Sequence, residues 1–201
     1  MKRALGVVAI VVWLSGRAAA AGDELSFTSA IDVNANCNAV WTTLTEFSRL
    51  AKLIPHLHGT ANVPRATQIG DMLFYTIDKA DKTKATGKFV TTSFEPAHRL
   101  QVMVQPDEGP WLRVQDFTLY AKPQAEKDGK QKKDVCHVEY EESYNQLALK
   151  FKQYDASGIV SNLRQPYMNI ILKRLKNLSE GKDAGPADEV KKLAELAKNF
   201  P

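Results

Sequence analysis

The residues best suited to chemistry in this 201-residue chain are four histidines and a short run of carboxylates. His56 and His58 lie two positions apart, so a single loop can offer two metal ligands, but a zinc site needs a third. His137 could be the third metal ligand only if folding brought it close to the other two. Histidines in loops or on the surface are far commoner than metal ligands, and we interpret His98 in the same way. We therefore expect no metal site.

Glu139, Glu141 and Glu142 are the candidates for acid–base chemistry. On a strand, Glu139 and Glu141 share one face and Glu142 takes the other. The solvated outer face of a sheet explains the first two, whereas the alternative makes one carboxylate a general base in an internal pocket. The sequence has no Gly-x-Ser-x-Gly elbow, Walker loop or Gly-x-Gly-x-x-Gly run. We therefore assign no catalytic residue and no cofactor.

Residues 1–21 have the three parts of a cleavable secretion signal. Lys2 and Arg3 precede the apolar run Ala4–Leu14, and small residues then offer a cleavage site after Ala20 or Ala21. The apolar run is shorter than the roughly 20 residues that cross a bilayer. No cysteine lies at the cleavage region, as a lipoprotein would need. We expect a periplasmic or secreted protein.

Removal of this leader changes the charge balance. The whole chain has 27 Lys and Arg against 23 Asp and Glu, a net charge of +4. The leader contains Lys2, Arg3 and Arg17 and no acid, so 24 basic residues then stand against 23 acidic ones, a net charge of +1. A nucleic-acid-binding domain would keep a strong basic excess, so we expect no nucleic-acid partner. The length fits one domain, residues 22–180, followed by a linker and a short amphipathic helix in residues 181–201.

The hydrophobic pattern predicts the elements that would position these side chains. A strand over Leu25–Asn34 is followed by a helix that Asn36 caps and by a second short helix that ends before Pro55. Period-two segments then predict six strands, at residues 61–66, 71–79, 84–94, 99–105, 112–122 and 134–146. A long helix over 156–179 has one apolar stripe. A sheet and one amphipathic helix bury their apolar faces when the sheet curls around the helix. This predicts a two-layer α+β domain.

This order, with the segment at residues 34–55 that contains the Val40–Trp41 pair, resembles the START-like (SRPBCC) superfamily. The polyketide cyclase/dehydrase and coenzyme Q-binding branch is the most similar part of it, and the likeness covers about Phe27–Leu178. The resemblance implies the helix-grip fold, a curved seven-stranded antiparallel sheet wrapped around a long C-terminal helix, with two short helices after the first strand. It also implies a cavity for an apolar ligand such as a lipid, sterol, quinone or polyketide, because an apolar pocket with few polar groups is a natural ligand site.

The same resemblance indicates which side chains would line that cavity. They come from the strands, from the second short helix at the mouth and from the long helix: Phe74, Phe89, Met103, Phe117, Tyr140, Leu53, Ile54, Tyr167 and Ile171. Core packing explains any single one of them equally well. A one-residue slip of a strand would also reverse its side chains.

Cys37 and Cys136 form an even pair, which in an oxidising compartment favours a disulfide. In START-like relatives the first and last strands are antiparallel neighbours. The resemblance therefore places Cys37, after the first strand, near Cys136, at the start of the last. Two buried thiols remain the alternative.

We expect an exported monomer that holds a hydrophobic small molecule as a carrier or sensor. The first alternative is an enzyme of the cyclase, aromatase or dehydratase type, which would need an acid–base pair in the same cavity. The second is an interaction module whose final helix docks on a protein or transiently on a membrane.

Overall fold

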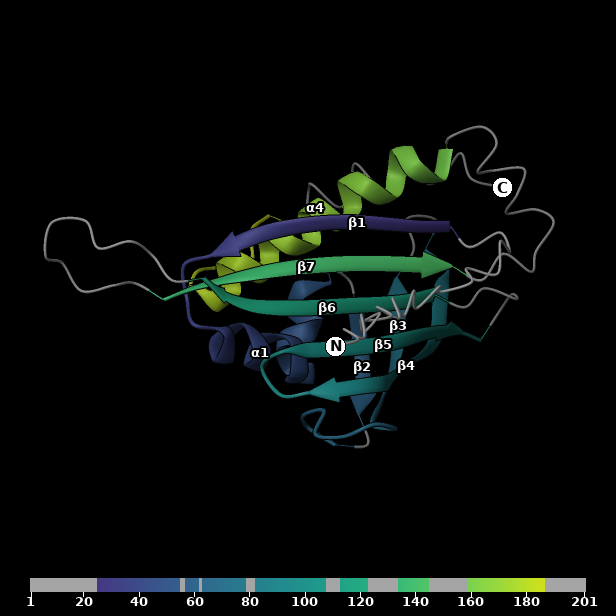
Figure 1. Ribbon diagram of the computed structural model, residues 1–201. Helices are drawn as coiled ribbons and strands as arrows, with labels where there is room; N and C mark the ends of the chain where they lie inside the picture. Colours follow the sequence, from purple (N-terminus) through teal and green to yellow (C-terminus); the bar gives the residue numbers. More distant parts are fainter. Residues whose placement is uncertain are drawn as a thin grey trace, which may run out of the picture.

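The seven strands form one antiparallel sheet in the order β1-β7-β6-β5-β4-β3-β2 (Figure 1). The computed structural model describes residues 25–54, 57–61, 63–78, 82–107, 113–122, 134–144 and 159–186. The expected leader, residues 1–21, and the expected final helix, beyond residue 186, lie outside the described residues. No helix within the described ranges is long and apolar enough to cross a membrane.

The elements follow the predicted order of one strand, two helices, six strands and a long helix, and the predicted fold class is confirmed. The strands are β1 (Leu25–Val33), β2 (Leu57–Ala61), β3 (Met72–Asp78), β4 (Lys84–Glu95), β5 (Arg99–Pro106), β6 (Arg113–Lys122) and β7 (Val135–Tyr144). The helices are α1 (Cys37–Thr45), α2 (Phe47–Leu53) and α4 (Ile159–Ser179).

One strand differs from its prediction. The second strand was expected at residues 61–66, but β2 ends at Ala61, and Arg65 forms only an isolated bridge with Glu46. β2 is one of the two edge strands of the sheet, and three of its five residues are exposed. An edge strand with so little buried surface has no apolar alternation from which its position could be predicted.

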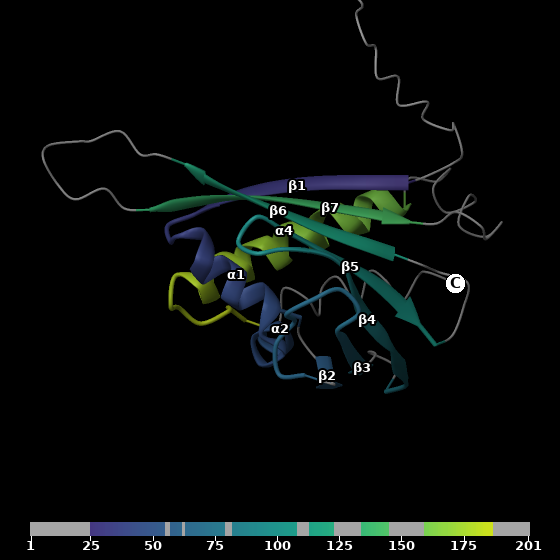
Figure 2. The same ribbon diagram turned by 60° about the horizontal axis from the view of Figure 1, so that its bottom comes forward.

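The helices cover one face of the sheet, and the sheet curls toward them (Figure 2). α4 packs on β1, α1 and α2. A β-bulge between Thr91 and Ser93 bends β4. Gly87 adds to the curl, since a Cβ there would lie 2.5 Å from the carbonyl oxygen of Gln105 and 2.6 Å from the hydroxyl of Tyr75. The curled sheet and the three helices enclose the apolar core.

A cap and a disulfide fix the start of α1. As predicted, Asn36 is the N-cap, and its Oδ1 accepts a hydrogen bond from the backbone N–H of Ala39 at 2.9 Å. The next residue, Cys37, is joined by a disulfide to Cys136 on β7, with 5.0 Å between the two Cα atoms. β1 and β7 pair so that Val33 lies opposite Cys136, which brings the end of β1 and the start of α1 to the bond.

Arg174 of α4 holds the C-terminal end of α2 by hydrogen bonds. This buried arginine donates from Nε to the carbonyl of Leu53 at 2.9 Å and from Nη2 to that of Lys52 at 2.6 Å. These carbonyls end α2 and have no partner inside the helix. Arg174 Nη1 also donates to the carbonyl of Gly185 at 3.0 Å, so the described part of the expected linker lies against α4.

Candidate functional site

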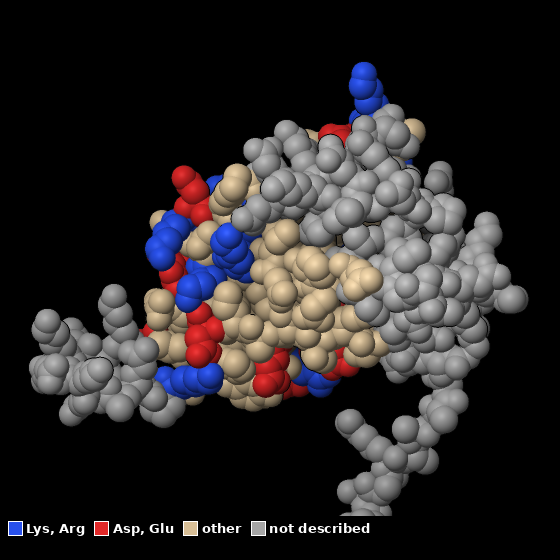
Figure 3. Space-filling view, turned by 90° about the horizontal axis from the view of Figure 1, so that it is seen from above, with Lys and Arg blue, Asp and Glu red and all other residues tan. Residues whose placement is uncertain are grey.

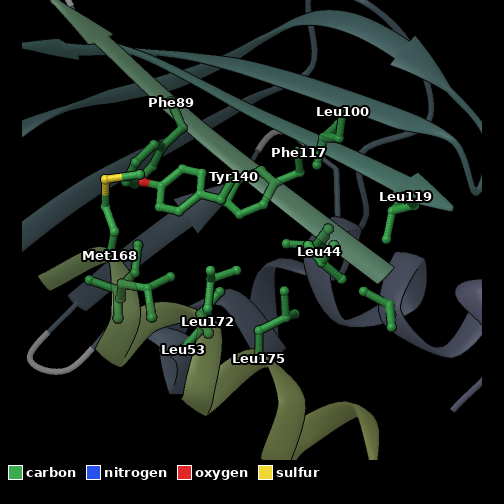
Figure 4. Packing of buried hydrophobic residues seen from close by; sticks show 14 of the residues in the cluster. Leu44, Leu53, Phe89, Leu100, Phe117, Leu119, Tyr140, Met168, Leu172 and Leu175 are labelled. Carbon is green, nitrogen blue, oxygen red and sulfur yellow. The ribbon is translucent and has the colours of Figure 1, made fainter. Parts of the chain in front are cut away.

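The core between the sheet and α4 is closely packed around Tyr140 and Phe117 (Figure 4). Their rings stack with 4.4 Å between centroids and an angle of 2° between planes. Met168, Leu172 and Leu175 point from α4 toward these strands. This half of the interior is filled by side chains, and the cavity of the domain lies beside it.

That cavity lies where α1 and α2 meet the sheet and α4, and its volume is about 30 Å³. Among the described residues, its lining is apolar or aromatic except for Thr91 and Gln115. The lining residues are Leu44, Phe47, Leu50, Leu53, Ile54, Ala66, Phe89, Thr91, Leu100, Val102, Gln115, Phe117, Tyr167 and Ile171. We call this cavity the interior pocket.

Six of the nine side chains proposed from the sequence come together here. Leu53 and Ile54 approach from α2 and its end, Phe89 and Phe117 from the sheet, and Tyr167 and Ile171 from α4. Tyr140 is fully buried but lies behind Phe117 and outside the lining. Whether any of them contacts a ligand remains a prediction.

Phe74 and Met103 do not line the pocket, and their expected positions were wrong. Phe74 is 49% exposed, and it lies opposite Lys88 while its neighbour Leu73 lies opposite the pocket residue Phe89. Met103 lies opposite Val90, whereas Val102 and Val104 on either side of it face inward. Both strands have apolar residues on both faces at these points. The sequence therefore did not indicate which side chains face inward.

A polar cluster lies directly behind the pocket wall. It is centred on Glu142 of β7, whose side chain is 0% exposed. Arg113 Nε lies 2.9 Å from Glu142 Oε1, and Arg164 Nη2 donates to the same oxygen. The hydroxyl of Tyr144 donates to Oε1 at 2.7 Å, and that of Tyr140 donates to Oε2 at 3.3 Å. We call these five residues the Glu142 cluster.

Besides the stacking of Phe117 on Tyr140, two polar contacts join this cluster to the pocket lining. Gln115 Nε2 donates to the hydroxyl of Tyr140 at 2.7 Å. The guanidinium carbon of Arg164 lies 4.7 Å from the centre of the Tyr167 ring, within cation–π range. Gln115 and Tyr167 thus contact both the pocket and the cluster.

The ionisation states of the cluster follow from its charges. Burial alone would raise the pKa of Glu142, but the charges of Arg113 and Arg164 outweigh it and hold that pKa below its ordinary value. Burial raises the pKa of Tyr140, and the charge of Glu142 raises it further. Burial likewise raises the pKa of Tyr144. At neutral pH the cluster is therefore a carboxylate, two guanidinium groups and two neutral phenols.

The sequence prediction missed Arg113 and Arg164, although it had placed Glu142 on the face opposite Glu139 and Glu141. Glu139 and Glu141 are exposed, as expected for the outer face. For Arg164 a signal existed, because it lies three positions before Tyr167 and seven before Ile171, within the inward stripe of the long helix. An arginine on such a stripe indicates a buried anionic partner.

A surface groove of about 300 Å³ lies on the other side of α2. It is lined by Phe47, Ser48, Ala51, Leu57, Gly59, Ala61, Pro64 and Leu73. Among the described residues, Phe47 is the one that belongs to the linings of both the groove and the interior pocket. The two cavities therefore meet the same side chain.

Solved structures share this architecture. The di-domain aromatase/cyclase StfQ from the steffimycin biosynthetic pathway matches with a TM-score of 0.56 and 13% identity, over 79% of this chain and 52% of StfQ. A protein from Arthrobacter aurescens matches with a TM-score of 0.54 and 15% identity, over 80% of this chain and 90% of that protein. The chain has the helix-grip fold. At these identities the likeness shows the fold alone, and no family model and no curated protein matches the sequence.

The three histidines that the structure describes do not line the pocket. His58 Nε2 lies 3.0 Å from Asp78 Oδ2, His98 Nδ1 lies 3.3 Å from the carbonyl of Leu119, and His137 Nδ1 lies 2.6 Å from Asp32 Oδ1. His56 lies outside the described residues. Among the described residues, no three His, Cys, Asp or Glu side chains are grouped as metal ligands.

The face over β1 and α4 shows how charge is distributed on the domain (Figure 3). Charged side chains gather toward the end where α4 ends, and the middle of this face is largely uncharged. Glu180, at that end, is paired with Lys176 at 3.1 Å and with Lys182 at 2.5 Å. Glu180 therefore offsets one of the two positive charges beside it.

Proposed function

We propose that this protein is an exported START-like binding protein that holds an apolar small molecule in the interior pocket, as a carrier or sensor. The observation that carries the proposal is that Phe47 lines both that apolar pocket and the surface groove. We propose that its aromatic side chain separates the two. The likeness of the fold to an aromatase/cyclase domain supports the same conclusion.

The interior pocket is too small for a ligand unless it opens further. A cavity of about 30 Å³ has room for about one water molecule, whereas ligand sites usually measure about 300–1,000 Å³. The pocket as it stands is a closed form. The groove measures about 300 Å³, so joining the two would reach the lower end of that range.

Phe47 is the side chain whose displacement would join them. The ends of α2 are anchored, because the backbone N–H of Phe47 donates to the carbonyl of Pro64 at 3.3 Å and Arg174 holds the carbonyls of Lys52 and Leu53. Of the seven residues of α2, only Leu53 is fully buried. We propose that the backbone of α2 stays in place while the partly buried ring of Phe47 rotates toward solvent.

Export is supported by two features. The first is the three-part leader at residues 1–21. The second is the bond between Cys37 and Cys136, because disulfides persist in oxidising compartments and are rare in the cytosol. We propose the periplasm or the extracellular space as the site of action.

We expect Phe47→Ala to speed the uptake of a neutral apolar dye, N-phenyl-1-naphthylamine, by about tenfold, which corresponds to a barrier lower by about 1.4 kcal/mol. Removing the ring opens the interior pocket to the groove. Phe47→Trp should slow uptake, because the larger side chain fills the passage. Stopped-flow fluorescence of the oxidised protein measures both rates.

Phe94→Ala is the matched control. Phe94 also packs partly buried in the core, with its ring 5.1 Å from that of Trp41, but it does not line the pocket. Its loss should leave the uptake rate unchanged. If neither the wild-type protein nor Phe47→Ala takes up the dye, the proposed function is wrong.

A further inference from the structure

The Glu142 cluster contains more positive than negative charge. Arg113 and Arg164 both approach one oxygen of one carboxylate, and the phenols beside it are neutral. Its net charge is therefore +1. A buried charge without a counter-charge is costly, so this arrangement favours a second anion.

The donors for such an anion are present. The Nε atoms of Arg113 and Arg164 are buried, and within the described part of the chain neither one donates a hydrogen bond. Arg113 Nε does lie 2.9 Å from Glu142 Oε1 in their ion pair, which leaves Arg164 Nε as the donor for an incoming group. The arginine side chains keep 20% and 21% of their surface exposed, whereas Glu142 is fully enclosed. Part of each arginine side chain is therefore accessible to an incoming group, whereas the carboxylate is not.

The cluster also lies at one end of the apolar pocket. Gln115 and Tyr167 belong to the pocket lining, and each contacts the cluster directly, Gln115 through Tyr140 and Tyr167 through Arg164. A molecule that fills the pocket up to this wall would place its end group beside the guanidinium of Arg164.

We infer that the ligand is an amphipathic acid, with its apolar body in the interior pocket and its carboxylate bound by Arg113 and Arg164. Guanidinium groups match a carboxylate with two parallel hydrogen bonds, and such charge-assisted bonds are stronger than neutral ones. This inference rests on the proposed function and adds the chemical class of the ligand to it.

The test compares three probes that share one ten-carbon chain: decanoic acid, 1-decanol and methyl decanoate. Each is titrated at pH 7 against the protein loaded with N-phenyl-1-naphthylamine, and displacement is followed by fluorescence. We expect the acid to displace the dye at a concentration about tenfold lower than the alcohol or the ester. In Arg164→Gln this preference should be lost, while Glu142 keeps its pairing with Arg113.

Arg99→Gln is the matched control, because Arg99 is an arginine paired with Asp116 at 2.6 Å, away from the pocket lining. It should keep the preference for the acid.

The comparison of probes on the wild-type protein decides the inference even where Arg164→Gln does not fold. Equal displacement by acid, alcohol and ester would overturn the inference and leave the proposed function standing. A protein that binds neither the dye nor any of the three probes would overturn both.

Discussion

Replacing Glu142 by alanine is expected to lower the free energy of unfolding by about 3–5 kcal/mol at pH 7, because it leaves two partly buried guanidiniums without their counter-ion. Glu142 also accepts hydrogen bonds from the hydroxyls of Tyr144 and Tyr140, which would lose their partner. Domains of this kind have a total stability of about 5–15 kcal/mol, so the loss would be a large share. Urea unfolding followed by circular dichroism measures it.

Glu141→Ala supplies the control on the same strand. Glu141 is exposed, and its described contact is a hydrogen bond from Ser26 at 2.7 Å, so its replacement should cost less than about 1 kcal/mol. A similar loss in both variants would contradict the role assigned to the Glu142 cluster.

The pH dependence of stability gives a second readout of the same residue. The pKa of Glu142 is held below its ordinary value of 4.5 in the folded protein. Its contribution is therefore fully present above the unfolded-state pKa and is lost as the pH falls through the lower folded-state pKa. Glu142→Gln should lack this acid-side loss.

Breaking the bond between Cys37 and Cys136 is expected to cost on the order of 4 kcal/mol, because the two residues are separated by 99 positions and the bond restricts a long loop of the unfolded chain. The bond also holds the start of α1 against β7. The urea midpoint with and without reductant measures the effect.

Reduced wild-type protein is a better comparison than an alanine variant, because Cys136 is fully buried and its truncation would add a cavity. Mass spectrometry after alkylation under native and denaturing conditions counts the thiols. Two free thiols in the unreduced wild-type protein would contradict the bond.

The order of elements could be predicted because the hydrophobic period changes along the chain. Phe89 follows Lys88, and Phe117 lies between Asp116 and Thr118, so the alternation of polar and apolar residues indicates their face. Phe74 and Met103 have apolar neighbours on both sides, and no such alternation exists there. Only the pairing of whole strands determines the phase at these two positions.

The polar part of the site depends on contacts between distant segments. Arg113 is 29 positions from Glu142, and Arg164 is 22 positions from it in the other direction. Strand β6 pairs with β7 so that Arg113 lies opposite Tyr144, and this register brings it beside Glu142. Local patterns contain no information on such a register, so the charges of the cluster were identified only in the folded structure.

The most direct test of the central proposal is a measurement of where on the protein an apolar molecule binds. Intermolecular nuclear Overhauser effects between N-phenyl-1-naphthylamine and the methyl groups of the oxidised protein would locate the dye. We predict effects to Leu44, Leu100 and Ile171, which line the interior pocket. Effects only to Leu57 and Leu73, which line the outer groove, would contradict the account.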